Sequence, residues 1–143
     1  MTDLVIDSSV AVKWFVPEQH DKEAARIFDE YLQGNLLFLA PDLIYAEFGN
    51  ILWKKQTLQG LDPIDAENIV TEFQTQISIR CISSASLLAD AYQIAVAHKR
   101  TVYDSLYLAL SLRENCQFVT ADEKLVNAIS PAFPNVIALA NWP

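Results

Sequence analysis

The chain has 143 residues, 52% of them hydrophobic, and its 10 Lys and Arg against 18 Asp and Glu give a formal net charge of −8. This length suits one domain spanning residues 1–143, and the charge argues against a protein that coats nucleic acid through clustered Lys and Arg. No apolar run approaches the roughly 20 residues that cross a bilayer. The start has no basic signal region, so we expect no membrane association and a cytoplasmic location.

In the N-terminal half, short apolar runs alternate with amphipathic segments. The run 4–6 is typical of a strand buried on both faces, and it ends in Asp7. We expect a short helix over 8–15, whose Ser hydroxyls suit a cap, and a second helix from Asp21 to Gly34. A strand over 36–39 and a helix from Asp42 to about Gln59 follow.

The C-terminal half continues the alternation. We expect further helices over 66–77, from Ser84 or Ser86 to about 99, over 105–112 and around 125–129. Further strands are expected over 77–82, 117–120 and 136–139. Strands that alternate with helices over short links favour an α/β fold, here a three-layer α/β/α sandwich with a central parallel sheet.

Four acidic residues occupy comparable positions in this pattern. Asp7 ends a strand, Glu47 lies on the apolar stripe of a long helix, Asp104 is in the first turn of a buried helix, and Asp122 follows another strand. The carboxyl ends of parallel strands meet at one edge of a sheet, where open α/β sheets bind ligands. We therefore expect these four carboxylates to share one crevice.

Each acid also has a simpler interpretation when it is taken alone. Asp104 and Asp122 stand where helix caps are common, and Asp7 is placed to cap the helix that follows it. Glu47 is the hardest to explain structurally, because a carboxylate on a core-facing stripe is costly unless it is paired or bound to a metal. The set of four favours a metal site more strongly than any single member does.

Carboxylates that converge repel each other unless cations lie between them, and an all-oxygen ligand set suits Mg²⁺ or Mn²⁺. Two such ions, roughly 4 Å apart, hold a phosphodiester, activate a water molecule and stabilise the leaving oxygen. No Ser-His-Asp triad is apparent. Cys81 and Cys116 are expected to be buried free thiols, because neither belongs to a zinc-ligand motif.

Several segments together resemble the PIN-domain family of metal-dependent ribonucleases, and within it the VapC-type toxins of toxin–antitoxin pairs. The matching pieces are Val5-Ile6-Asp7-Ser8-Ser9, Pro41 to Glu47 with Asn50, Tyr103-Asp104-Ser105-Leu106-Tyr107-Leu108-Ala109, and Val119-Thr120-Ala121-Asp122-Glu123-Lys124-Leu125. Their order and spacing cover nearly the whole chain.

The resemblance implies cleavage of RNA that depends on Mg²⁺ or Mn²⁺, with Asp7, Glu47, Asp104 and Asp122 as metal ligands and catalytic residues. It gives supporting roles near the metals to the hydroxyls of Ser9 and Thr120. It also implies a homodimer and a small antitoxin whose tail enters the site.

Binding of RNA by so acidic a chain would rely on local positive charge. Lys54 follows Glu47 by seven residues, about 10 Å along nearly the same helix face. Lys13 is the favoured candidate, because it lies on the short helix that leaves directly from Asp7. We expect both to contact phosphates beyond the metals, although a solvated surface position would also explain them.

Two other classes of function compete with the nuclease, a silent binding module and a phosphatase or receiver-type domain. A catalytically silent PIN-like module for binding or dimerisation is less favoured, because all four acids are present. A phosphatase would show an Asp-x-Asp pair, but Ser8-Ser9 follows Asp7. A receiver domain would place adjacent acids before its first helix, and the chain has none there.

Overall fold

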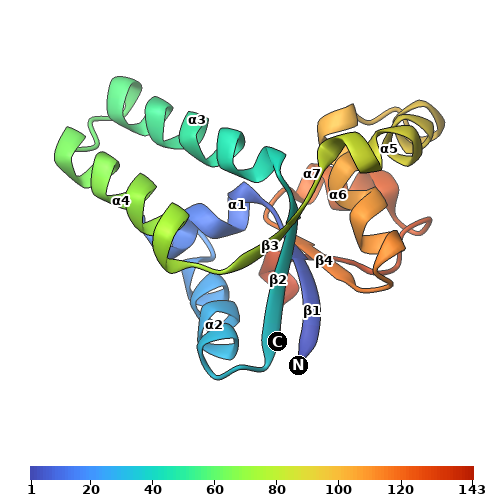
Figure 1. Cartoon of the computed structure of the whole chain (residues 1–143), viewed down its shortest axis with the longest axis horizontal. Helices are drawn as coiled ribbons and strands as arrows, with labels where there is room; N and C mark the ends of the chain where they lie inside the picture. The colour runs from blue at the N-terminus through green and yellow to red at the C-terminus, as the bar shows by residue number, and fades with distance from the viewer.

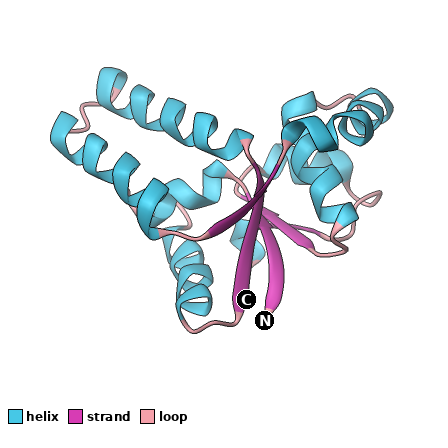
Figure 2. Cartoon of the chain, in the orientation of Figure 1, coloured by secondary structure: helices cyan, strands magenta, loops and turns pink.

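A computed structural model describes all of residues 1–143 and shows a central sheet of five parallel strands (Figures 1 and 2). Their order in space is β3-β2-β1-β4-β5. The strands are β1 (Thr2–Ile6), β2 (Leu36–Pro41), β3 (Ile79–Ile82), β4 (Gln117–Thr120) and β5 (Val136–Ala138). The expected α/β/α architecture with a parallel sheet is confirmed.

Helices cover both faces of this sheet, with α1 to α4 on one side and α5 and α6 on the other in Figure 1. The α-helices are α1 (Ser8–Ala11), α2 (Asp21–Leu32), α3 (Leu43–Leu58), α4 (Pro63–Gln76), α5 (Ser84–His98), α6 (Val102–Arg113) and α7 (Glu123–Ile129). Two short 3-10 helices are η1 (Val12–Trp14) and η2 (Leu139–Asn141). No helix is both long and apolar enough to span a membrane.

The order of the strands reverses at β1. From β1 the chain moves outward to β2 and β3, then crosses back to place β4 on the other side of β1. Parallel pairing sets Val5 opposite Phe118 and Ile6 opposite Val119, so the next residues, Asp7 and Thr120, emerge side by side. Such a switch point leaves a crevice at the carboxyl ends of the two strands, which is where ligands bind in open α/β sheets.

The middle of the sheet is the most deeply buried part of the core, because helices cover both faces of its central strands. Leu4, Val5 and Ile6 are at most 1% exposed, and Phe118 and Val119 on β4 are fully buried. Apolar burial of this kind stabilises the fold by roughly 25 cal/mol per Å². It also fixes the two strand ends that carry polar side chains into the crevice.

Several helix starts differ from the sequence prediction. The helix expected over 8–15 is α1 followed by η1, and Asp7 caps it by accepting from the backbone N–H of Val10 at 3.3 Å. The cap of α6 is Thr101, whose hydroxyl accepts from the N–H of Asp104 at 3.1 Å. Asp42 precedes α3 but accepts from the N–H of Ser84 at 3.1 Å, so it serves the start of α5. Both cysteines are free, as expected, but the prediction that they are buried is wrong: Cys81 is exposed on the edge strand β3, and Cys116 is only half-buried.

Two serines of α6 provide a matched test of buried polar groups. Both are fully buried, but the Ser105 hydroxyl has no hydrogen-bond partner, whereas that of Ser111 donates to the carbonyl of Leu108 and accepts from Asn135 Nδ2. We expect Ser105→Ala to raise the free energy of unfolding by about 1 kcal/mol and Ser111→Ala to lower it by a similar amount. Urea unfolding measures both changes, and equal losses in the two variants would contradict this expectation.

Candidate metal and phosphodiester site

Asp7 is held from three sides at the end of β1. Its Oδ1 accepts from the hydroxyl of Ser9 at 2.5 Å and from the N–H of Val10, and its Oδ2 accepts from the hydroxyl of Thr120 at 2.5 Å. Ser9 follows Asp7 by two residues, and Thr120 arrives on the neighbouring strand β4. The carboxylate is therefore fixed by both strands at the switch point.

The two hydroxyls that hold Asp7 are themselves oriented by the segment after β4. Ser9 Oγ accepts from the N–H of Ala121 at 3.0 Å, and Thr120 Oγ1 accepts from the N–H of Asp122 at 3.1 Å. Because each hydroxyl accepts from an N–H group, its own proton is free to point at Asp7. The resemblance gives Ser9 and Thr120 supporting roles, and in the structure both hydroxyls donate to Asp7.

The environment of Asp7 disfavours its charge. Burial raises its pKa to about 6, the hydrogen bonds from Ser9, Thr120 and Val10 work against that rise, and the charge of Asp104 adds to it. A carboxylate with so high a pKa in a crevice is a frequent feature of functional sites.

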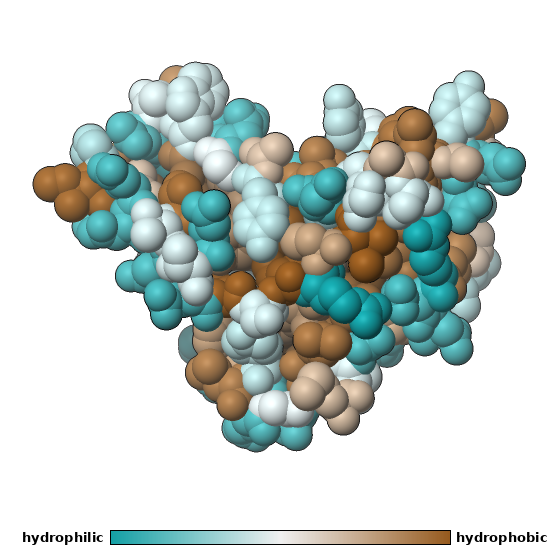
Figure 3. Space-filling model, viewed as in Figure 1, coloured by the Kyte–Doolittle hydropathy of each residue, from teal (hydrophilic) through white to brown (hydrophobic).

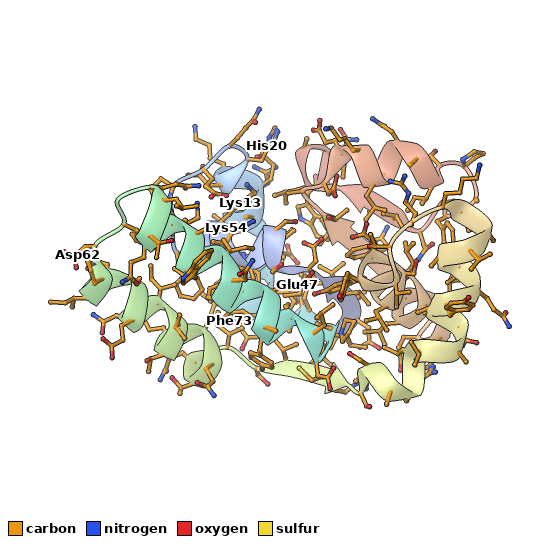
Figure 4. All side chains as sticks on the ribbon, turned by 90° about the horizontal axis from the view of Figure 1, so that it is seen from above. Lys13, His20, Glu47, Lys54, Asp62 and Phe73 are labelled. Atoms are coloured by element: carbon orange, nitrogen blue, oxygen red, sulfur yellow. The ribbon has the colours of Figure 1, made fainter.

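Glu47 enters the crevice from the second turn of α3, on the side that Figure 4 shows facing the centre of the molecule. Its Oε1 accepts from the phenolic hydroxyl of Tyr107 on α6 at 2.5 Å. Burial raises the pKa of Glu47, the bond from Tyr107 opposes this, and the charges of Asp7 and Asp104 raise it further. Glu47 is thus a half-buried acid whose pKa is raised by the charges of two other acids.

Asp104 is the third residue of α6 and leaves the capping of that helix to Thr101. A role as helix cap therefore does not account for Asp104. Burial raises its pKa, the charge of Asp122 adds to the rise, and the Thr101 hydrogen bond and the Arg100 charge oppose it. Asp104 is consequently the third of these acids, after Asp7 and Glu47, that the fold keeps in an environment unfavourable to its charge.

Asp122 is exposed and caps α7, its carboxylate accepting from the N–H of Leu125 at 3.1 Å. The capping interpretation is sufficient for Asp122 taken alone. Its charge nevertheless raises the pKa of Asp104, so the two carboxylates lie close enough to interact electrostatically.

The four predicted acids are linked through their charges, but they do not converge on one point. No three of the His, Cys, Asp and Glu side chains form a group that could hold a metal ion. Like charges repel, which opposes closer approach. The donor set is nonetheless carboxylate oxygen with two hydroxyls beside it, and this chemistry fits a hard divalent cation such as Mg²⁺ or Mn²⁺.

The two predicted phosphate-binding lysines differ in their surroundings. Lys13 donates to Glu18 at 3.0 Å and is only 10% exposed, and Lys55 of α3 bonds to the other oxygen of the same carboxylate. Lys54 is exposed on α3 beyond Glu47 and has no ion-pair partner (Figure 4). Figure 3 shows the surface hollowed at its upper edge, between the part formed by α3 and the part formed by α5.

Sequence reasoning missed the partners of two predicted residues. Tyr107 follows Asp104 by three residues, so the helical period alone places both on one face of α6, but nothing local shows that this face meets Glu47. Glu18 stands in a loop, and its pairing with Lys13 and Lys55 depends on how η1 packs against α3.

The parallel sheet whose strand order reverses at β1, with helices on both faces, makes the chain an α/β protein, and Asp7 lies at the point of reversal. A family model described as the PIN domain matches residues 4–129. The chain belongs to the PIN-domain family.

Comparison with individual proteins agrees with this assignment. The chain is 31% identical over 123 residues to Ribonuclease VapC3 of Pyrobaculum aerophilum, which covers 85% of this chain and 91% of that protein. The crystal structure of PAE2754, also from Pyrobaculum aerophilum, superposes with a TM-score of 0.70 at 20% identity over 97% of this chain and 90% of its own. A toxin–antitoxin complex from Klebsiella pneumoniae gives a TM-score of 0.59 at 11% identity, over 95% and 97% of the two chains.

The raised pKa of Asp7 predicts a pH-dependent effect of its removal. Between pH 3.8 and about 6 the folded protein holds a proton that the unfolded chain has released, so this residue lowers stability as the pH rises through that window. The variant Asp7→Asn does not titrate. With each pKa unit worth about 1.4 kcal/mol, and allowing for solvent contact and weaker hydrogen bonds, we expect it to be about 2 kcal/mol more stable than the unmodified protein at pH 8.

This advantage should shrink as the pH is lowered towards 4, because the unmodified Asp7 then becomes neutral in the folded state. Urea unfolding of both proteins in EDTA at pH 8, 6 and 4.5 measures the difference. A difference that stays constant over this range would contradict the assignment of the raised pKa to Asp7.

Proposed function

We propose that this protein is a metal-dependent endoribonuclease that cleaves phosphodiester bonds of RNA as the toxin of a toxin–antitoxin pair. The observation that carries the proposal is the set of acids Asp7, Glu47, Asp104 and Asp122, whose charges are linked through Asp104, near the switch point of a PIN-domain sheet. The 31% identity to Ribonuclease VapC3 supports the ribonuclease activity.

In this proposal the four carboxylates are catalytic residues that bind Mg²⁺ or Mn²⁺. Bound ions would supply positive charge that holds the scissile phosphate, activates a water molecule and stabilises the leaving oxygen. Asp7 is the most firmly placed of the four, because Ser9 and Thr120 both donate to it. Their hydroxyls fix which lone pairs of Asp7 remain available, so we assign them positioning roles.

The substrate-binding proposal concerns Lys54 and Lys13, which lie on the same side of the crevice (Figure 4). Lys54 has no ion-pair partner and is the better placed to meet a phosphate. Lys13 would have to share its charge with Glu18. In a cleavage assay, Lys54→Ala should raise KM severalfold and weaken its salt dependence while leaving kcat nearly unchanged, and an unchanged KM would remove Lys54 from the proposal.

The proposed activity is tested by incubating the purified protein with mixed cellular RNA, in Mg²⁺, in Mn²⁺ and in EDTA. We expect discrete fragments only with metal, and a loss of about 100-fold or more in Asp7→Asn and Asp104→Asn. Asp62→Asn is the matched control, because Asp62 caps α4 at the far end of the α3–α4 pair (Figure 4).

Cleavage in EDTA, or cleavage by Asp104→Asn at the unmodified rate, would contradict the metal-dependent mechanism. An absence of cleavage in every condition, with metal binding retained, would favour the catalytically silent PIN-like module.

The proposal includes a small antitoxin protein as partner, a homodimer, and a cytoplasmic location where cellular RNA is available. The structural similarity to a chain of a toxin–antitoxin complex from Klebsiella pneumoniae supports an antitoxin partner. Light scattering of the purified protein should give twice the mass of one chain, 16.1 kDa. Co-expression with a short reading frame adjacent to its gene should yield a complex that cleaves no RNA. A monomeric mass, or full activity of that complex, would remove the corresponding part of the proposal.

A further inference from the structure

One contact joins two parts of the crevice that lie 60 residues apart in the chain. The hydroxyl of Tyr107 on α6 donates to Oε1 of Glu47 on α3 at 2.5 Å. Tyr107 is only 3% exposed, and Glu47 is the sole hydrogen-bond partner of its hydroxyl. A buried tyrosine normally finds a partner for its hydroxyl, and here the partner is one of the four acids of the site.

The ring of Tyr107 is held firmly by the sheet. It lies nearly parallel to the ring of Phe118, with centroids 5.5 Å apart and planes inclined by 11°. Phe118 is fully buried on β4 and pairs with Val5 of β1, the strand that ends in Asp7. The position of the Tyr107 hydroxyl is therefore set by the same strand pair that places Asp7 and Thr120.

Glu47 needs such a restraint more than the other acids do. Its side chain has three rotatable bonds, and it projects from a helix towards the charges of Asp7 and Asp104, which both disfavour its ionised form. The bond from Tyr107 occupies Oε1, and no protein group donates to Oε2. One oxygen is thereby fixed and the other stays available on the side of the crevice.

The Tyr107 hydroxyl can only act as a donor in this contact. Burial raises the pKa of Tyr107 well above its ordinary value, and the charges of Glu47 and Asp7 raise it further. A phenol that donates to one carboxylate oxygen fixes the direction in which that carboxylate points, because the hydrogen bond has a preferred geometry.

We propose that Tyr107 is a positioning residue of the nuclease site, which acts by holding Glu47 in the orientation needed to bind a divalent cation. The inference rests on the proposed function, since it assigns Glu47 to metal binding. The positioning role of the hydroxyl differs from a packing role of the ring, because a phenylalanine at position 107 would fill the same space against Phe118 but could not hold Glu47.

The test removes the hydroxyl alone. Tyr107→Phe keeps the ring that stacks on Phe118, and we expect its fold to persist by circular dichroism while Mn²⁺ binding, measured by titration calorimetry, becomes about tenfold weaker. In the RNA cleavage assay, kcat at a fixed, subsaturating Mn²⁺ concentration should fall by a similar factor with little change in KM for RNA. A purely structural role would change stability without changing Mn²⁺ affinity.

Tyr31→Phe is the matched control. Tyr31 of α2 stacks on Phe38 of β2 with centroids 4.6 Å apart and planes inclined by 14°, and its hydroxyl accepts from the N–H of Ser78 at 2.9 Å. The variant removes a hydroxyl from an equivalent ring stack that does not touch the four acids. Its Mn²⁺ affinity should equal that of the unmodified protein.

A second pair of variants tests whether Tyr107 acts through Glu47. In a Glu47→Gln background, Tyr107→Phe should weaken Mn²⁺ binding by less than twofold, because the group that it positions is no longer a carboxylate. Equal losses with and without Glu47, or unaltered Mn²⁺ affinity in Tyr107→Phe, would overturn the inference and leave the nuclease proposal standing. An unmodified protein that binds no Mn²⁺ and cuts no RNA would overturn both.

Discussion

The pairing of β1 with β4 is the constraint on which the rest of this structure depends. It closes the middle of the sheet with residues that are almost completely buried, and its register sets the end of β1 beside the end of β4. Asp7 and Thr120 meet because of this register, and the segment after Thr120 then supplies the N–H groups that orient the two hydroxyls on Asp7. A slip of one residue would turn these side chains to the opposite faces of the sheet.

The free energy gained in the core offsets an unfavourable arrangement at its edge. Three of the four acids have pKa values raised above the ordinary range, with burial as the main cause and neighbouring carboxylates as an additional one. Hydrogen bonds from Ser9, Thr120 and Tyr107 reduce this cost without removing it. Sites that keep like charges together in this way commonly sacrifice stability for function.

The acidic net charge is compatible with the proposed RNA substrate, because some Lys and Arg side chains are engaged in ion pairs within the fold and others are not. Several are engaged within the fold: Lys13 and Lys55 share Glu18, Arg80 pairs with Glu114, and Arg113 lies near Asp90. Lys54 is exposed on α3, the helix that carries Glu47. Binding strength in such a protein depends on the few unpaired cations beside the crevice and on ions held by its carboxylates, which the overall charge does not reveal.

The sequence alone determined the alternation of strands and helices and the parallel sheet, and it singled out the four acids proposed as the site. These features follow from local patterns: a continuous apolar run for β1, a helical stripe interrupted by Glu47, and acids placed just after strands or at helix starts. The PIN-domain resemblance was equally local, because its motifs are short segments in a fixed order. Only the tertiary structure decided that Thr101 and not Asp104 caps α6, that Asp42 serves α5, that Lys13 is paired with Glu18, and that Tyr107 reaches Glu47. Each of these depends on how elements distant in the chain pack together, and the pattern of residues within one helix or strand carries no information about its partner across the fold.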